Sequence, residues 1–247
     1  MTGTTGPSNV ARLAPTRALV PLRTKDFLSV LDLDPVEIVR ILDLAAEMKR
    51  LRRAGRTAAP ALAGQHVALL FEKPSLRTRA TFVIAVRELG GEVIEPPPDV
   101  ALGDREAVED VARNLERWVS GAVVRTFAQH RLARFAAAAP SLHVVNALTN
   151  EQHPCQALAD LLTLRETAGS LAGRTVAFVG DGNNVAASLA HAGAMLGVHV
   201  RVASPEDFTL PAHVVAEAAA AAREGGTVDV LTDPVEAVRG ADVVYTD

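Results

Sequence analysis

The 247-residue sequence contains one cysteine, few aromatic residues and no long apolar run. The single Cys155 excludes an internal disulfide bond and favours a reducing, cytoplasmic location. Aromatic residues make up only 4%, so the core must consist mainly of alanine, valine and leucine. No apolar stretch approaches the ~20 residues of a transmembrane helix, which argues against a membrane partner. The net charge of −4 lacks the basic field that a nucleic-acid-binding protein needs.

Acidic residues are absent from the first 25 positions, where arginine, threonine and proline are frequent. An acid-poor, arginine-bearing start is compatible with an organelle transit peptide. The prolines, however, argue against a continuous targeting helix. A disordered extension over residues 1–24 is therefore the favoured interpretation.

Secondary-structure signals alternate along the rest of the chain. A first helix is expected at Asp34-Pro35-Val36-Glu37, where Asp34 is the N-cap and Glu37 completes a capping box. Apolar, β-branched runs predict strands at 67–71, 93–94, 122–126, 143–146, 175–179, 199–203, 228–231 and 242–246. Helices are expected between most of them, for example at 79–89, 107–119, 158–167 and 184–196.

This alternation predicts an α/β fold with two doubly wound parallel-sheet domains. We expect the first domain to span residues 25–165 and the second residues 166–247. The chain ends directly after its last strand, so the second domain is expected to be incomplete.

The stretch "FEKPSLRTR" begins at Phe71, at the end of a predicted strand. In parallel sheets, ligands bind at the carboxyl ends of strands, where helix N-termini offer free N–H groups. Ser75 is expected to cap the next helix. Ser75 and Thr78 would hold phosphate oxygens, while Arg77 supplies a bidentate guanidinium. The alternative is a capped helix that carries surface arginines.

Arg125 ends the otherwise apolar strand of "VRTF". An arginine in such a strand is costly unless it meets an anion or a carboxylate. Ligand binding and structural pairing both remain open on this residue alone.

The segment "HPCQ" places His153 and Gln156 at the start of a helix. This pair suits a polarised carbonyl group, because histidine can donate to the oxygen and glutamine can contact the substituent. Alternatively, His153 is a turn residue and Gln156 a polar residue of the first helical turn. Cys155 is interpreted as a small core residue, since the sequence places no base beside it.

The segment "GDGNN" starts like a dinucleotide-binding fingerprint, with Gly180 and Gly182 after a strand. Val185 occupies the position of the third glycine, and a GxG pattern alone is weak support for a nucleotide-binding oxidoreductase. Asn183 and Asn184 offer amide groups that suit the main chain of an amino acid better.

The four segments "FEKPSLRTR", "VRTF", "HPCQALADLLTL" and "GDGNN" occur in this order in the ornithine carbamoyltransferases, and the sequence resembles that family from about Phe27 onward. "SxRTR" and "HPxQ" are shared with aspartate carbamoyltransferases, whereas "GDGNN" points to the ornithine branch. The resemblance implies transfer of the carbamoyl group from carbamoyl phosphate to the side-chain amine of L-ornithine, giving L-citrulline and phosphate in arginine metabolism. It also implies a homotrimer, or a multiple of trimers, that needs no metal or organic cofactor.

The same resemblance assigns roles to individual residues. Those that would bind carbamoyl phosphate are Ser75, Leu76, Arg77, Thr78, Arg125, His153 and Gln156. Of these, Arg125, His153 and Gln156 would be catalytic. Asn184 and Asp247 match positions that bind ornithine.

Three departures from the family pattern bear on the activity. Leu76 replaces a common threonine, and Ala101 replaces a glutamine that reaches the neighbouring subunit's site in many members. The family continues past Asp247 with "SMG" and "HCLP" segments, so we expect the sequence to be a fragment or an early-terminated product. The alternatives are an inactive carbamoyl-phosphate-binding protein and a carbamoyltransferase for putrescine or acetylornithine.

Overall fold

The computed structural model describes residues 20–97, 102 and 105–247. Most of the predicted extension, together with Ala101, therefore lies outside the described residues. The helices and strands, in chain order, are η1 (Val30–Asp32), α1 (Pro35–Arg53), β1 (His66–Phe71), α2 (Arg77–Glu88), β2 (Glu92–Ile94), α4 (Val108–Leu115), β3 (Gly121–Arg125), α5 (Gln129–Ala138), β4 (His143–Leu148), α6 (Pro154–Ala168), β5 (Thr175–Val179), α7 (Asn184–Met195), β6 (His199–Ala203), η2 (Glu206–Phe208), α8 (Ala212–Ala221), β7 (Thr227–Leu231), α9 (Pro234–Val238) and β8 (Val243–Tyr245).

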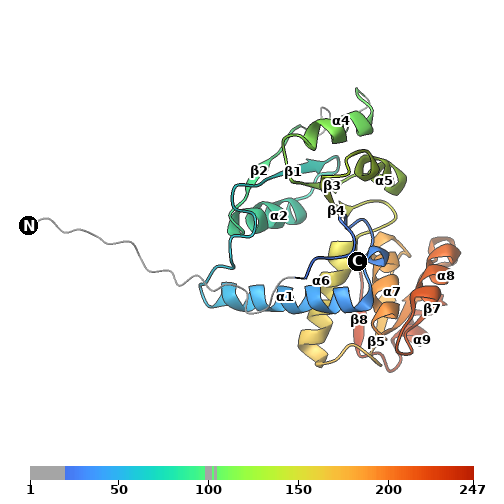
Figure 1. Cartoon of the computed structure of the whole chain (residues 1–247). Helices are drawn as coiled ribbons and strands as arrows, with labels where there is room; N and C mark the ends of the chain where they lie inside the picture. The colour runs from blue at the N-terminus through green and yellow to red at the C-terminus, as the bar shows by residue number, and fades with distance from the viewer. Residues whose placement is uncertain (1–19, 98–101, 103–104) are drawn as a thin grey trace, which may run out of the picture.

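The strands form two four-stranded sheets in the described part of the chain (Figure 1). Their orders are β2-β1-β3-β4 and β7-β6-β5-β8, and all the strand pairs are parallel. Each predicted strand is present, with its ends within two residues of the predicted ones. The prediction of an α/β fold with two parallel sheets is thus confirmed.

Helices cover both faces of the first sheet. Helices α4 and α5 bury Leu115, Leu132 and Phe135 against one face. Helix α2 packs Val86 against the other face (Figure 1). Because both faces of the sheet are buried, the strand sequences are mainly apolar and do not alternate between apolar and polar residues.

The second sheet is also covered on both faces, but unequally. Helices α7 and α8 pack on the face that carries Phe178 and Val202, in a core shared with α6. The opposite face meets the short helix α9 through Ala237.

The N-terminal segment connects the two sheets. Asn146 of β4 donates from its backbone N–H to the carbonyl of Phe27 (2.8 Å), which extends the edge of the first sheet. Helix α1 then begins with the predicted capping box: the N–H of Glu37 donates to Asp34 (2.8 Å), and the N–H of Asp34 to Glu37 (3.0 Å). Its buried residues Ile38 and Leu42 belong to the core of the second sheet, and α1 lies alongside α6 (Figure 1).

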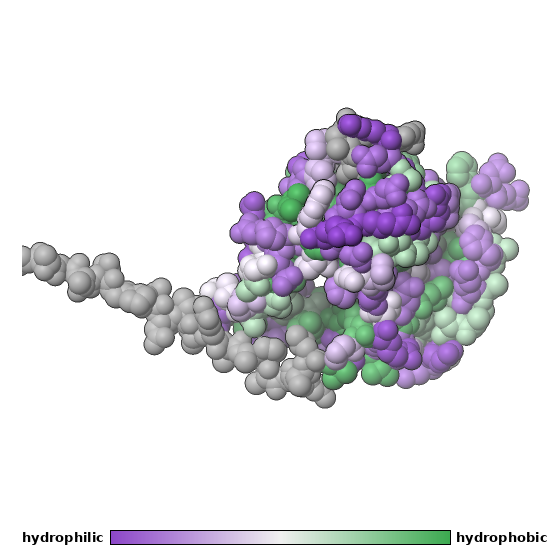
Figure 2. Space-filling model, turned by 45° about the horizontal axis from the view of Figure 1, so that its top comes forward, coloured by the Kyte–Doolittle hydropathy of each residue, from purple (hydrophilic) through white to green (hydrophobic). Residues whose placement is uncertain are grey.

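Among the described helices, none is both long enough and apolar enough to cross a membrane. In the view of Figure 2, hydrophilic residues gather over the first sheet and its helices, whereas apolar residues are more evident over the second.

Candidate active site

The carboxyl ends of β1, β3 and β4 bring together three of the segments predicted to be functional. Arg125 pairs in register with Phe71 on one side and with Leu148 on the other. The loops that start at Glu72 and Thr149 therefore flank the end of β3. The chain's C-terminus lies close to this point, between the two sheets (Figure 1).

The start of α2 differs from the prediction in one respect. Leu76, not Ser75, occupies the N-cap, and no described side chain caps the helix. Leu76 has helical dihedral angles (φ −78°, ψ −56°), whereas a capping side chain needs an extended backbone. Ala80 forms the first helical hydrogen bond, so the N–H groups of residues 77–79 are left without helical partners.

The side chains around this helix start are accessible. Ser75 and Thr78 are half-buried, and Arg77 is exposed. Arg79 forms an ion pair with Glu95, whereas Arg77 forms none with a described carboxylate. A free guanidinium thus lies next to the positive end of the α2 dipole, an arrangement that attracts anions.

Arg125 is partly buried, and no carboxylate among the described residues forms an ion pair with it. Its Nε atom is buried and has no hydrogen-bond partner among the described residues. Burial lowers the pKa of its guanidinium. An unpaired cation is costly in such a position, which favours an anionic ligand over structural pairing.

His153 lies at the N-cap of α6, and its backbone N–H donates to Oγ of Ser188 (2.8 Å). Its Nδ1 atom is buried and has no hydrogen-bond partner in the described part of the chain. Burial, and then the charge of Arg125, lower the pKa of His153 to about 4, although Asp247 opposes the shift. The imidazole is therefore neutral near pH 7 and can act as a neutral hydrogen-bond donor.

Gln156 is held by a residue that the sequence did not point to. Its Nε2 donates to Oδ1 of Asp160 (2.9 Å), one turn further along α6. Burial raises the pKa of Asp160, while the hydrogen bond from Gln156 and the nearby Tyr245 hydroxyl oppose that shift. The i, i+4 spacing of Gln156 and Asp160 in "QALAD" was the available signal for this pair.

The second sheet contributes residues from the ends of β5 and β8. Asn183 caps α7, accepting from the N–H groups of Val185 (2.9 Å) and Ala186 (3.2 Å). Its Nδ2 donates to Oδ2 of Asp247 (3.2 Å). Asn184 instead donates to the backbone carbonyl of Thr149, in the loop after β4. The predicted Asn184 and Asp247 thus lie near the first-sheet residues, and Asn183 supports Asp247.

Packing accounts for Gly182 of the "GDG" segment. A Cβ atom at this position would lie 2.4 Å from the backbone nitrogen of Leu210 and 2.7 Å from the carbonyl carbon of Thr209. The backbone N–H of Gly182 also donates to Phe208 (2.8 Å). Contact with the loop before α8 therefore explains this glycine without a nucleotide.

Lys73 is a further charged residue near the site that the sequence did not single out. Its Nζ donates to Oδ1 of Asn150 (2.5 Å) and lies 4.6 Å from the centre of the Phe127 ring. Burial, and then the charge of Arg125, lower its pKa. It adds a second cation to this end of the first sheet.

The surroundings of Cys155 do not favour a reactive thiolate. Burial raises the pKa of the Cys155 thiol to about 12, and its sulfur contacts the carbonyl oxygen of Asn146 at 3.5 Å. The thiolate, which is the reactive form, is therefore disfavoured. The described part of the chain holds no cluster of three histidine, cysteine, aspartate or glutamate residues suited to a metal.

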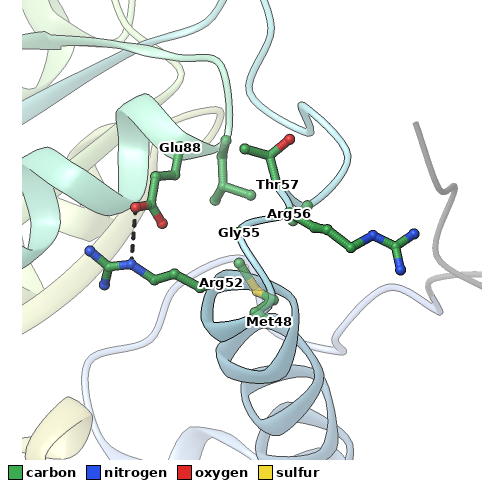
Figure 3. A pocket seen from close by; sticks show the side chains of 8 residues that line it. Met48, Arg52, Gly55, Arg56, Thr57 and Glu88 are labelled. Carbon is green, nitrogen blue, oxygen red and sulfur yellow. Dashed lines mark ion pairs between the residues drawn. The ribbon is translucent and has the colours of Figure 1, made fainter. Parts of the chain in front are cut away.

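A separate hollow of about 210 Å³ lies where α1 and α2 end (Figure 3). Met48 and Leu89 line it, and Arg52 pairs with Glu88 at its edge (Nε to Oε1, 3.2 Å). Glu88 is roughly 16 Å along α2 from the helix start, given the rise of about 1.5 Å per residue. This hollow is therefore distinct from the candidate site at the strand ends.

Comparison with known proteins identifies the family. The model for the aspartate/ornithine carbamoyltransferase carbamoyl-P binding domain matches residues 25–166, and the model for the Asp/Orn binding domain of the same family matches residues 172–247. An ornithine carbamoyltransferase of Acidothermus cellulolyticus is 50% identical over 90% of this chain and 71% of its own length. One from Parafrankia is 49% identical over 92% of this chain and 72% of its own length.

Solved structures agree with these relatives. The ornithine carbamoyltransferase of Pyrococcus furiosus superposes with a TM-score of 0.88 at 39% identity, over 92% of this chain and 73% of its own. That of Gloeobacter violaceus superposes with a TM-score of 0.80 at 45% identity, over 91% of this chain and 74% of its own. The chain spans about seven tenths of the length of these relatives. It belongs to the aspartate/ornithine carbamoyltransferase family.

Proposed function

We propose that the protein transfers the carbamoyl group of carbamoyl phosphate to the side-chain amine of L-ornithine, giving L-citrulline and phosphate. The observation that carries this proposal is the unpaired, partly buried Arg125 beside the neutral His153, where the two sheets meet. Family membership and the ornithine carbamoyltransferase relatives support the same reaction.

The phosphate group would bind at the start of α2. Ser75 and Thr78 offer hydroxyl groups, and residues 77–79 offer free backbone N–H groups. Arg77 and Arg125 supply positive charge. Leu76 has no polar side chain and takes part only through its backbone. Helix dipole, amides and guanidinium groups together favour a bound phosphate.

The carbamoyl group would lie between Arg125, His153 and Gln156. Neutral His153 and cationic Arg125 donate to the carbonyl oxygen, which becomes negatively charged when the amine attacks. The uncharged ornithine amine forms the new C–N bond, and the C–O bond to phosphate then breaks. The amine proton leaves with phosphate or solvent. This chemistry needs positioning and electrostatic stabilisation rather than a metal or organic cofactor.

The amino-acid substrate would bind on the second-sheet side of the site. Asp247, held by Asn183, faces the same region as His153 and provides a carboxylate for the side-chain amine. Asn184 lies at the start of α7, where its amide is held by the carbonyl of Thr149. It would orient the main chain of ornithine.

The larger organisation follows from the same proposal. A carbamoyl-phosphate-binding domain over residues 25–165 and an ornithine-binding domain over residues 166–247 would meet at α6. The active form would be a cytoplasmic homotrimer or a multiple of trimers. Light scattering coupled to size-exclusion chromatography tests this assembly, and a monomer at all concentrations would contradict it.

Citrulline formation by the purified 247-residue chain tests the function. Arg77→Ala is expected to lower citrulline production at least about 100-fold, because it removes a charge from the proposed phosphate site. Arg87→Ala is the matched control, since Arg87 lies in the last turn of the same helix. Putrescine and N-acetylornithine serve as competing amines.

Turnover with ornithine that depends on Arg77 but not on Arg87 would support the proposal. Faster turnover with putrescine or N-acetylornithine would reassign the amine substrate. Carbamoyl phosphate binding without any turnover would identify this chain as a binding protein instead.

A further inference from the structure

We propose that Asp160 is a positioning residue that fixes the carboxamide of Gln156 with its oxygen facing the carbamoyl group. The inference rests on the proposed function and deepens it, because it adds a residue that does not itself touch the substrate. It also connects the proposed carbamoyl site with the last strand of the second sheet.

The geometry comes from helix α6. Gln156 lies in its first turn, and Asp160 follows one turn later on the same face. The Nε2–Oδ1 distance of 2.9 Å is that of a normal hydrogen bond. Both side chains are half-buried, so water competes only in part for this contact.

The chemistry of the two groups selects one orientation of the amide. An ionised carboxylate only accepts hydrogen bonds, so it binds the NH₂ end of a glutamine and not its oxygen. With Nε2 held by Asp160, Oε1 is directed away from it. A carbamoyl group carries an NH₂ with two donors, for which this oxygen is the matching acceptor. Rotation of the amide by 180° would instead oppose NH₂ to NH₂.

Asp160 adjoins the last strand of the second sheet. Its Oδ2 atom is buried and has no hydrogen-bond partner among the described residues, and Tyr245 of β8 is close enough to affect its pKa. Tyr245 in turn stacks on Phe178 of β5, with ring centres 5.3 Å apart. Asp247 follows Tyr245 by two residues, so the supports for the carbamoyl and ornithine subsites adjoin one another.

Affinities for two probes separate positioning from a general structural role. We would titrate carbamoyl phosphate and inorganic phosphate into wild type and the Asp160→Ala, Asp160→Asn and Gln156→Ala variants. Glu166→Gln is the control for loss of a carboxylate on the same helix, since Glu166 is exposed and pairs with Lys49. Inorganic phosphate lacks the carbamoyl group and should not sense Gln156.

The expected result is graded. Asp160→Ala weakens carbamoyl phosphate binding about tenfold, which corresponds to one lost hydrogen bond. Asp160→Asn weakens it less, because the asparagine oxygen can still accept. The affinity for inorganic phosphate changes less than about twofold in both Asp160 variants. Adding Asp160→Ala to Gln156→Ala has no further effect, because the aspartate acts only through the glutamine.

A ligand-free measurement tests the orientation directly. The side-chain amide resonance of Gln156 is the one that disappears from the nitrogen–proton NMR spectrum of Gln156→Ala. We expect Asp160→Ala, but not Glu166→Gln, to shift this resonance and to speed its exchange with water. An unchanged resonance would overturn the inference.

Two other results would count against the inference in different ways. Equal losses for both probes, or full additivity with Gln156→Ala, would mean that Asp160 only supports the fold. If wild type bound carbamoyl phosphate no better than phosphate, the proposed function would fail, and with it the role toward the carbamoyl group. The NMR comparison would still decide whether Asp160 orients Gln156.

Discussion

Single residues of the site depend on neighbours that are distant in sequence, and Gly182 is an example. A Cβ atom on Gly182 would lie so close to the backbone of Thr209 and Leu210 that no side chain fits. Gly182→Ala is therefore expected to destabilise the protein by about 1–3 kcal/mol through overpacking. Urea unfolding followed by circular dichroism measures this change.

Gly121 is the matched control for that substitution. A Cβ atom there would meet its nearest neighbour at 3.5 Å, which is ordinary contact, and the residue lies in a strand. Gly121→Ala should therefore be neutral or slightly stabilising. Equal losses for the two variants would show that close approach is not the reason for glycine at 182.

His153 gives the stability a dependence on pH. Its pKa of about 4 in the folded state lies below the ~6.5 of an unfolded histidine, so the unfolded chain binds the proton more readily between these values. The free energy of unfolding should therefore fall as the pH drops below about 6.5. Between pH 7 and pH 5, His153 alone accounts for about 2 kcal/mol of this loss. Burial also lowers the pKa of His191, which adds a loss in the same direction.

Substitution separates His153 from the other groups that titrate. His153→Gln should retain more of its stability at pH 5 than wild type does, as judged by urea unfolding at the two pH values. His130→Gln changes an exposed histidine of α5 and should behave like wild type. An identical pH-dependent loss in wild type and His153→Gln would rule out this explanation.

The sequence identified some of the residues at this site and missed others for physical reasons. Arg125 and His153 could be predicted to lie together because Arg125 ends one strand of a parallel sheet and His153 follows the carboxyl end of another. Asp160 and Lys73 were missed because they contact Gln156 and Asn150 through their side chains, and spacing alone does not rank such residues above ordinary surface positions. The expected Ser75 cap was wrong because Leu76 has a helical backbone there, a detail that residue types do not determine.

Among the elements, helix α1 shows which features the local sequence predicts and which it does not. Its start was predicted from the Asp34–Glu37 capping box, which the structure contains. Its packing partner was not predictable, because an amphipathic helix can bury its apolar face against any complementary surface. In the structure α1 precedes the first sheet in sequence but packs in the core of the second.

Two leucines of α1 test that packing. Leu42 is 1% exposed in the second-sheet core, whereas Leu44 is 40% exposed. Leu42→Ala should lower the free energy of unfolding by about 2–5 kcal/mol, because it leaves a cavity. Leu44→Ala should cost no more than about 0.5 kcal/mol. Similar losses for the two variants in urea unfolding would contradict the observed orientation of the helix.

In the whole molecule, this N-terminal segment connects both sheets and should make them unfold together. Residue 27 pairs with β4 of the first sheet, and Leu42 is buried with the second. Helix α1 packs in the core of the second sheet, and the segment before it extends the first sheet. The stability of each sheet therefore depends on the other. The two four-stranded units are therefore expected to behave as one cooperative structure, although each has its own apolar core.

Hydrogen exchange measured by mass spectrometry at increasing urea concentration tests this coupling. Peptides from β1 and β3 report on the first sheet, and peptides from β5 and β6 on the second. In wild type, both sets should lose protection at the same urea concentration, and Leu42→Ala should shift both by the same amount. If only the β5 and β6 peptides shifted, the first sheet would be stable without α1, and the N-terminal segment would not couple the two units.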